Sequence, residues 1–160
     1  MLNADYDSSV VFSGWTSHLD LIQIALEANS FKYVRLDGSM GRKKRGDALA
    51  IFRDDPSVCI ILVSIGAGGL GLNLTSASKV FMMEPQFNPA AEAQAVDRVH
   101  RLGQNRDVTI HRYIMRGSFE EKMLALQQKK KDLAELSMNR KLDRVEAAKQ
   151  KMEELRDLFK

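Results

Sequence analysis

Short apolar runs alternate with helical patterns along most of this chain, and this alternation constrains the fold more than any other feature. The run CIILVS at 59–64 is continuously apolar, as expected for a strand covered on both faces. Other runs predict strands at 10–12, 33–36, 79–84 and about 108–114. Helical patterns follow the first two strands; one begins with Thr16 or Ser17 as its N-cap, and the other runs from about Arg42 to Asp54. The pattern predicts an α/β fold, a parallel sheet with helices on both faces.

Polar and glycine-rich segments follow the predicted strands at the points where the strands end. These segments are 13–16, 37–42, 64–75 and 84–88. The carboxyl ends of parallel strands lie at one edge of a sheet, and α/β proteins bind their ligands at that edge. We therefore expect these four segments to lie along one edge and to carry the function.

The segment at 88–104, NPAAEAQAVDRVHRLGQ, has the composition of a helix. Pro89 suits a first helical position, the alanines favour propagation, and Gly103 stands where a helix would stop. At helical spacing, three apolar residues share a side that should pack: Val96, Val99 and Leu102. An amide and two guanidinium groups share another side: Gln94, Arg98 and Arg101.

Two arginines on one face of a packed helix suit the binding of a polyphosphate. A guanidinium group stays protonated, and its donor fork matches phosphate oxygens in pairs. The alternative is a solvated surface on which Asp97 and Arg101 form an ordinary i, i+4 pair.

The glycine-rich segment at 66–71 contains a formal GxGxxG after a strand, with Glu84 at the end of the next strand. Only a short segment rich in Asn, Ser and Thr follows it, too short for the long crossover helix of a dinucleotide fold. The chain also has no GxxxxGK[ST] phosphate loop, because Asp47 follows the nearest glycine pair. Any nucleotide must therefore be held mainly by groups from elsewhere.

The length of 160 residues predicts one domain, or one domain with an appendage. The hydrophobic content of 44% is sufficient for a core and indicates a soluble globular chain. No apolar run approaches a membrane span, and the N-terminal sequence lacks the pattern of a secretory leader. The single cysteine, Cys59, is expected to be a small buried hydrophobe in a reducing compartment. The scattered His18, His100 and His111 suggest no metal site.

The net charge of +3 is compatible with nucleic acid, and its distribution is more informative. Five cations crowd into one short stretch: Arg35, Arg42, Lys43, Lys44 and Arg45. A second cluster of cations, three consecutive lysines, lies at 129–131. Each cluster is either a polyanion-binding surface or an ordinary solvated face.

Four segments together resemble a known family. In chain order they are VVFSGWT, RLDGSM, VSIGAGGLGLNLTSASKVFMMEPQFNP and QAVDRVHRLGQ. They are similar to motifs IV to VI in the C-terminal motor lobe of Swi/Snf-family DNA translocases, within helicase superfamily two. The segment EEKMLALQQKKKDLA at 120–134 resembles the branch of helicase-like transcription factors, repair translocases and transcription terminators. The resemblance implies a leader at 1–9, a RecA-like lobe at 10–117 and a helical brace or extension at 118–160.

The resemblance also implies roles for individual residues at an ATP site that a separate first lobe mainly builds, with its P-loop lysine and its magnesium ligands. Gln94, Arg98 and Arg101 would act on the nucleotide from the second lobe, with Arg101 as the arginine finger. The backbone at Gly69 and Gly71 would lie near the nucleotide, where glycine permits close approach. The cofactor implied is ATP with Mg²⁺.

Contacts to the DNA backbone are implied for the same motifs, with further charge from two cations of the basic cluster. The residues concerned are Thr16, Ser39, Arg42, Lys43, Asn73 and Thr75. Phe87 stands where the family commonly has tryptophan before Asn-Pro, so Phe87 and Asn88 are further candidates near DNA. Phenylalanine keeps an aromatic face but lacks the indole donor.

Beyond 118 the chain is helical in pattern. Ser118 followed by Glu120 and Glu121 predicts a helix start, because acids suit a first turn. An apolar stripe near the end is expected to fold back on the domain or to pair with another chain: Leu142, Val145, Met152, Leu155 and Phe159.

The resemblance implies one lobe of a nuclear, ATP-dependent translocase on double-stranded DNA, naked or nucleosomal, that works with the N-terminal lobe of its parent and touches no membrane. The isolated chain is expected not to hydrolyse ATP. The alternative is a non-enzymatic module that docks DNA or protein through the basic cluster and the terminal helix.

Overall fold

A sheet of five parallel strands forms the centre of the computed structural model, which describes residues 8–69 and 71–137. The strands are β1 (Ser9–Ser13), β2 (Tyr33–Leu36), β3 (Ile60–Ser64), β4 (Lys79–Met82) and β5 (Thr109–Arg112). Their order across the sheet is β2-β3-β1-β4-β5, and Val11 of the central strand pairs with Leu62 on one side and Phe81 on the other. The predicted parallel sheet is confirmed.

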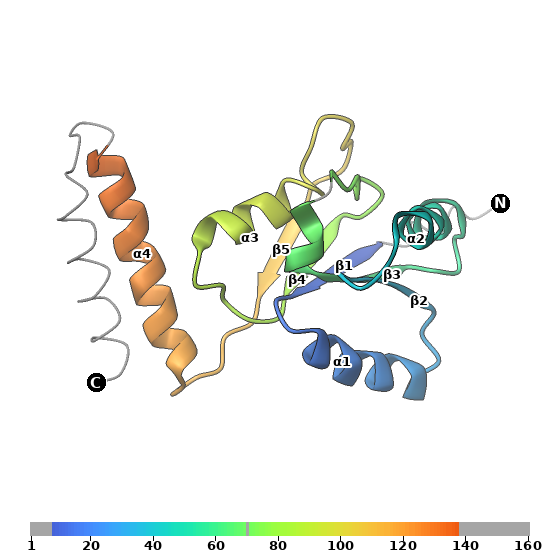
Figure 1. Cartoon of the computed structure of the whole chain (residues 1–160), viewed down its shortest axis with the longest axis horizontal. Helices are drawn as coiled ribbons and strands as arrows, with labels where there is room; N and C mark the ends of the chain where they lie inside the picture. Colours follow the sequence, from blue (N-terminus) through green and yellow to red (C-terminus); the bar gives the residue numbers. More distant parts are fainter. Residues whose placement is uncertain (1–7, 70, 138–160) are drawn as a thin grey trace. The chain divides into compact units, whose positions relative to one another are not determined.

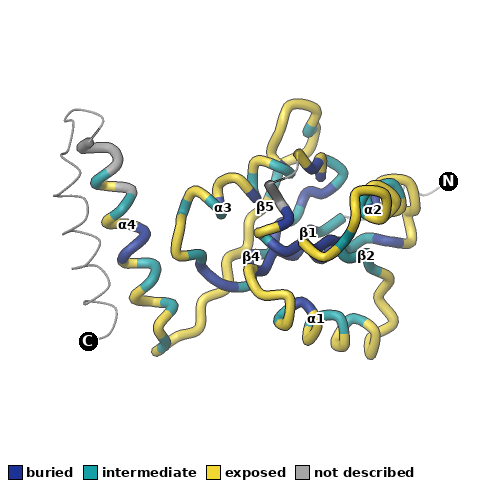
Figure 2. Tube along the Cα trace, in the orientation of Figure 1, coloured by how far each residue is buried: buried dark blue, intermediate teal, exposed yellow. Residues whose placement is uncertain are grey.

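Helices cover both faces of this sheet, as the alternation predicts (Figure 1). On one face α1 (Thr16–Ala28) packs Leu19 against Val11 and Leu62. On the opposite face lie α2 (Arg42–Asp54), which contributes Phe52, and α3 (Pro89–Val96), which contributes Ala95. The core is buried most deeply along β1 and β3, whereas all four residues of β5 are exposed (Figure 2).

The predicted bounds of β2 and α2 match the structure. The predicted N-cap of the first helix and the predicted burial of Cys59 do not. Helix α1 begins at Thr16 itself, and its N-cap residue is Trp15. No side chain among the described residues caps it, so the prediction of Thr16 or Ser17 as N-cap was wrong. Cys59 is half-buried rather than buried, because it precedes β3.

The crossover from β3 to β4 begins with a short 3₁₀ helix, η1 (Ile65–Gly69). Between η1 and β4 the described residues are turns and irregular backbone. This confirms that the glycine-rich segment does not open a long crossover helix, which a dinucleotide fold requires.

Helix α3 is much shorter than the helix predicted for 88–104. Pro89 opens it as expected, but it ends at Val96, and the N–H groups of Arg98 and Val99 then donate to carbonyl groups three residues earlier. Val99 is fully buried as predicted, whereas Leu102 is fully exposed. The helical argument that placed Gln94, Arg98 and Arg101 on one face was therefore wrong, although each residue remains a candidate.

The chain divides into two compact units, Met1–Glu84 with Ala90–Tyr113, and Pro85–Pro89 with Ile114–Lys160. The second unit contains α4 (Phe119–Ser137). The Ser118 hydroxyl accepts a hydrogen bond from Glu120 N–H at 3.1 Å, and Glu120 and Glu121 occupy the first turn, which confirms the predicted helix start. The apolar stripe between Leu142 and Phe159 lies outside the described residues.

Candidate functional site

The loops at the carboxyl edge of the sheet meet at a point where the chain path diverges. From β1 the chain turns toward β2, and from β4 it turns toward β5 on the other side. Such a divergence is where open α/β sheets place their ligands. The candidates in the loops after β1 and β2 lie at this edge. Asn73 and Thr75 were expected there too, but their segment leads into the start of β4 and bonds to the segment at 98–104, so it lies toward the amino edge.

Glu84 lies at this divergence, two residues beyond β4, and its side chain is only 10% exposed. Its carboxylate accepts hydrogen bonds from Ser13 Oγ at 3.0 Å and from Gly14 N–H at 2.5 Å. His18 Nδ1 lies 3.1 Å from the same carboxylate. The loop after β1 is therefore bound at three points to one buried acid.

Arg35 links the loop after β1 to the loop after β2. Its Nε donates to Asp37 Oδ2 at 2.9 Å, its Nη1 contacts the carboxylate of Asp20, and its Nη2 donates to the Thr16 carbonyl at 3.4 Å. The Asp20 hydrogen bond is the main cause of a raised pKa of Arg35, which keeps its charge at every physiological pH. Arg35 therefore cannot serve as a free cation for a ligand.

The turn after β2 is closed by Asp37. Its Oδ1 accepts from both the N–H and the hydroxyl of Ser39, and these bonds, the hydroxyl first, lower the pKa of Asp37. Arg45 donates from Nη2 to the carbonyls of Asp37 and Gly38, each at 3.1 Å. Two of the five clustered cations, Arg35 and Arg45, are thus structural.

Arg42, Lys43 and Lys44 are the exposed remainder of the basic cluster. They form the first turn of α2, whose N-cap Gly41 has no side chain to offer and whose first turn has no acid. Exposed cations beside unsatisfied backbone N–H groups produce a positive end to the helix. This part of the predicted basic surface is therefore available to an anion.

A second closed turn carries Asn73 and Thr75, where Asn73 Oδ1 accepts from the N–H and the hydroxyl of Thr75 at 3.2 and 2.9 Å. The residue between them, Leu74, is fully buried and donates its N–H to the carbonyl of Arg98 at 3.0 Å. Gln104 adds a bond from Nε2 to the Ala77 carbonyl at 2.7 Å. These bonds join the segment at 73–77 to the segment at 98–104.

The three candidates for the nucleotide differ in burial. Gln94 and Arg101 are exposed, while Arg98 is half-buried. The Nε of Arg98 is buried and has no hydrogen-bond partner among the described residues. A buried donor without a partner is costly, and an arriving anion would satisfy it.

Gly71 adopts a φ of +66°, a conformation that residues with a side chain rarely adopt. Gly69 ends η1 five residues after β3. The glycine at 71 is therefore required by the backbone of this loop, whatever approaches it.

Phe87 and Asn88 belong to the second unit, so their contacts are described within it. The residue Phe87 is 38% exposed, and Lys130 Nζ lies 3.7 Å from the centroid of its ring, within the range of a cation–π contact. Gln127 donates from Nε2 to the Gln86 carbonyl. The loop that carries Phe87 is thus held against α4.

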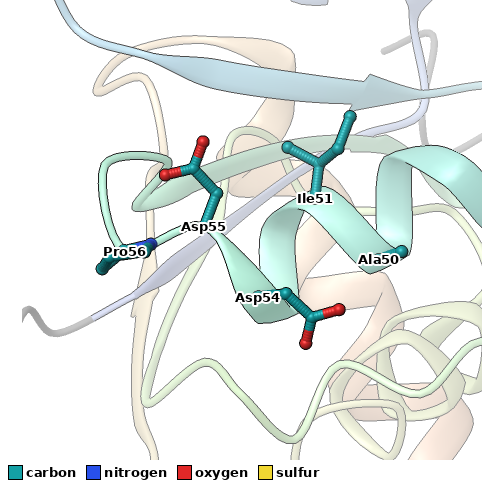
Figure 3. A pocket seen from close by; sticks show the side chains of 5 residues that line it. All are labelled: Ala50, Ile51, Asp54, Asp55 and Pro56. Atoms are coloured by element: carbon teal, nitrogen blue, oxygen red, sulfur yellow. The ribbon is translucent and has the colours of Figure 1, made fainter.

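A hollow of about 450 Å³ lies at the opposite edge of the sheet, beside the C-terminal end of α2 (Figure 3). It is lined by Ala50, Ile51, Asp54, Asp55 and Pro56. Its two acids would repel phosphate, so it is not the nucleotide site. Among residues 8–69 and 71–137, no three His, Cys, Asp or Glu side chains gather as a metal site, and no helix is long and apolar enough to cross a membrane.

A family model described as the helicase conserved C-terminal domain matches residues 1–103. The chain belongs to this helicase family. It is 43% identical to the DNA repair protein RAD5A of Arabidopsis thaliana over 99% of this chain and 15% of that protein. It is 46% identical to the helicase-like transcription factor of Homo sapiens over 94% of this chain and 15% of that protein. These are Swi/Snf-type proteins, of whose length the chain spans about 15%.

A solved structure of this helicase family has the same fold. The crystal structure of the C-terminal part of the Fun30 ATPase domain superposes with a TM-score of 0.74 and 36% identity, over 76% of this chain and 39% of that chain. The sheet of this helicase lobe is therefore RecA-like, as the resemblance implies.

Sequence reasoning missed three structural side chains of this helicase lobe: Ser13, His18 and the paired Arg35. All three lie on β1, on β2 or at the start of α1, near the predicted edge. Their position near this edge could have marked them as candidates, but their hydrogen-bond partners depend on the tertiary structure. Ser13, for example, meets Glu84 only because of the register of β1 against β4.

Proposed function

We propose that this helicase lobe is the second motor lobe of a nuclear, ATP-dependent translocase on double-stranded DNA. The family match and the repair proteins among the relatives support a motor. The observation that carries the proposal is a contrast among the arginines: Arg35 and Arg45 are hydrogen-bonded within the fold, while Arg42 and Arg101 are exposed. The parent's N-terminal lobe and DNA, naked or nucleosomal, are the proposed partners.

At the nucleotide, Arg98 and Arg101 would bind phosphate oxygens with Gln94 beside them. The buried Nε of Arg98, which lacks a partner among the described residues, fits an anionic group. The exposed Arg101 fits a finger that acts only when a second lobe closes. ATP with Mg²⁺ would supply the phosphoryl transfer, and a guanidinium that stabilises its charge is worth roughly 10³ to 10⁵ in rate. Gly71 and the neighbouring Gly69 would bring backbone close to the phosphates.

At the DNA, the backbone would be held by the loops after β1, β2 and η1. Arg42 and Lys43 supply charge that is independent of base sequence. The exposed Asn73 offers its amide, since its oxygen is already bonded to Thr75. Ser39 and Thr75 shape the turns through their hydroxyls, and Thr16 begins α1 with an exposed side chain. Phe87 and Asn88 would add contacts from the second unit.

The hydrogen bond from Leu74 N–H to the Arg98 carbonyl links the proposed DNA contacts at 73–75 to the proposed nucleotide contacts Arg98 and Arg101. We propose that lobe closure, which moves Arg98 and Arg101 onto phosphates, also shifts the loop at 73–75 along the DNA backbone. Since the chain contains no GxxxxGK[ST] sequence, the isolated lobe should not hydrolyse ATP.

The deciding experiment measures DNA-stimulated ATPase activity of the full-length parent with Arg101→Ala. We expect turnover to fall by about 10³ while affinity for DNA is retained, because an arginine finger acts in the transition state. Arg53→Ala is the matched control: Arg53 is also exposed, but it lies near the end of α2 and pairs with Asp54. Unchanged turnover in Arg101→Ala would contradict the motor proposal and favour a docking module.

A further inference from the structure

Trp15 is the only tryptophan of the chain, and its residue is 68% exposed. It lies at the carboxyl end of β1, directly before the DNA-contact candidate Thr16. A single exposed apolar side chain is ordinary on a protein surface. What distinguishes Trp15 is the degree to which its backbone is fixed.

Ser13 Oγ binds the backbone of Trp15 on both sides: it accepts from Trp15 N–H at 3.0 Å and lies 3.1 Å from the Trp15 carbonyl. The same hydroxyl lies 3.0 Å from Glu84 Oε2, and its single proton favours the carboxylate because a charged acceptor forms the stronger bond. Gly14 N–H is also bound to Glu84. The indole therefore projects from a loop whose conformation is set by one buried carboxylate.

An exposed aromatic side chain on a fixed backbone is suited to binding, because little conformational entropy is lost when a ligand arrives. The ligand should be a polyanion. Helix α1, which starts at Thr16, has no acid in its first turn, nor has α2, and the exposed Arg42 and Lys43 lie at the same edge. An indole also carries an N–H that can donate to phosphate and a face that can pack on sugar or base.

We propose that Trp15 contacts the DNA directly and that Glu84 is the residue that positions it. This inference rests on the proposed function, since it assumes that DNA occupies this edge. Glu84 acts through the loop and does not itself touch DNA: its carboxylate is buried and its acceptors are used by Ser13, Gly14 and His18.

The single tryptophan makes a direct test possible with the 160-residue chain itself. A fluorescently labelled duplex is titrated at low salt, and duplex anisotropy and Trp15 emission are recorded in the same samples. We expect the emission to change with the same midpoint as the anisotropy, and acrylamide quenching of Trp15 to fall. Trp15→Ala should weaken duplex affinity about five- to tenfold, in the range of losing one aromatic contact to nucleic acid, whereas Trp15→Phe should lose less.

The positioning role of Glu84 is tested with Glu84→Gln against Glu92→Gln. Glu92 is also buried, at 3% exposed against 8% for Glu84, and pairs with Arg112 at 2.8 Å. We expect Glu84→Gln alone to increase acrylamide quenching of free Trp15 and to weaken duplex affinity. When Glu84→Gln is added to Trp15→Ala, affinity should fall little further, because a residue that acts only through Trp15 has nothing left to position.

Each outcome decides the inference. If the duplex binds while Trp15 emission is unchanged and Trp15→Ala binds normally, Trp15 is no DNA contact, and the proposed function stands without it. If the duplex does not bind even at low salt, both the inference and the proposed DNA contacts fail. If acrylamide quenching of Trp15 is unchanged by the duplex and falls only when the parent's N-terminal lobe is present, Trp15 contacts that lobe and the inference is overturned. The fluorescence titration needs no substitution, so it remains decisive if Glu84→Gln does not fold.

Discussion

Arg35 and Arg42 belong to the same basic cluster in the sequence, yet they have opposite roles in the molecule. Arg35 donates to Asp37, to Asp20 and to the Thr16 carbonyl, and its side chain is 22% exposed. Arg42 is exposed in the first turn of α2, and no hydrogen bond or ion pair of its side chain is recorded among the described residues. Local charge density is therefore a poor measure of what a surface can bind, because the fold uses some of the cations itself.

The two kinds of cation depend on each other. Arg45 and Asp37 shape the turn that precedes α2, and this turn presents Arg42 and Lys43 at the carboxyl edge. A substitution of a structural cation should therefore alter stability first and binding second. A substitution of an exposed cation should alter binding alone, and this difference is what the following substitutions probe.

The largest effect on stability is expected for Arg35→Ala, which leaves Asp37, 10% exposed at its side chain, without its ion pair. We expect a loss of about 2 to 3 kcal/mol in the free energy of unfolding, because a partly buried carboxylate loses a charged partner. Urea denaturation measures it. Arg53→Ala, which breaks an exposed pair with Asp54, should leave the urea midpoint unchanged; equal losses in the two variants would contradict the distinction.

Removal of both exposed cations, Arg42→Gln with Lys43→Gln, should weaken duplex binding about tenfold at low salt and reduce the slope of log K against log salt by roughly 2, since each phosphate contact contributes about 0.9. Stability should not change. Lys32→Gln with Arg53→Gln removes the same charge from exposed residues at the opposite edge and serves as the control. A control that weakens binding to the same extent would show that only net charge matters.

Arg45→Lys keeps the charge but loses the fork that binds two carbonyls. We expect a loss of about 1 kcal/mol in stability, the usual net value of such hydrogen bonds, with a small change in duplex affinity. The neighbouring Lys44→Ala should be neutral in urea denaturation. If Arg45→Lys were as stable as the unsubstituted lobe, Arg45 would belong with the exposed cations.

The smallest effect concerns Ser39→Ala, which removes the main cause of the lowered pKa of Asp37. A lowered carboxyl pKa in the folded state stabilises the fold above the ordinary pKa of the group, and this contribution is lost as the pH falls through the folded value. The unsubstituted lobe should therefore exceed Ser39→Ala in stability by under about 1 kcal/mol at neutral pH, and the gap should close below about pH 4. NMR titration of the Asp37 carboxyl gives the direction directly, and an unchanged pKa would exclude this role of Ser39.

The sheet was predictable because its signals are local. The bounds of β2 and α2 follow from an apolar run and from Pro56 two residues beyond the helix end. The early end of α3 was not predictable in the same way. No glycine or proline interrupts the chain between Val96 and Gly103, but the backbone of Arg98 and the side chain of Gln104 bond instead to the loop that precedes β4. A tertiary contact overrode propensity there.

The carboxyl edge of the sheet was predictable, but which candidate residues lie there was predictable only in part. Parallel strands place their carboxyl ends together, so the edge followed from the fold class. Which cations are exposed depends on pairs such as Arg35 with Asp20, which lie on different elements and are invisible to spacing rules. The same is true of Glu84, whose role follows from the register between β1 and β4.

The bonds between the segments at 73–77 and 98–104 have a consequence for protein engineering. Leu74 and Ala77 are each tied to the second segment by a hydrogen bond to or from its residues, Arg98 and Gln104. A chimera that takes one segment from a relative and keeps the other would combine two halves of a single hydrogen-bonded part. The two segments should therefore be exchanged together, whereas the chain between them, which contains β4 and α3, can keep its own sequence.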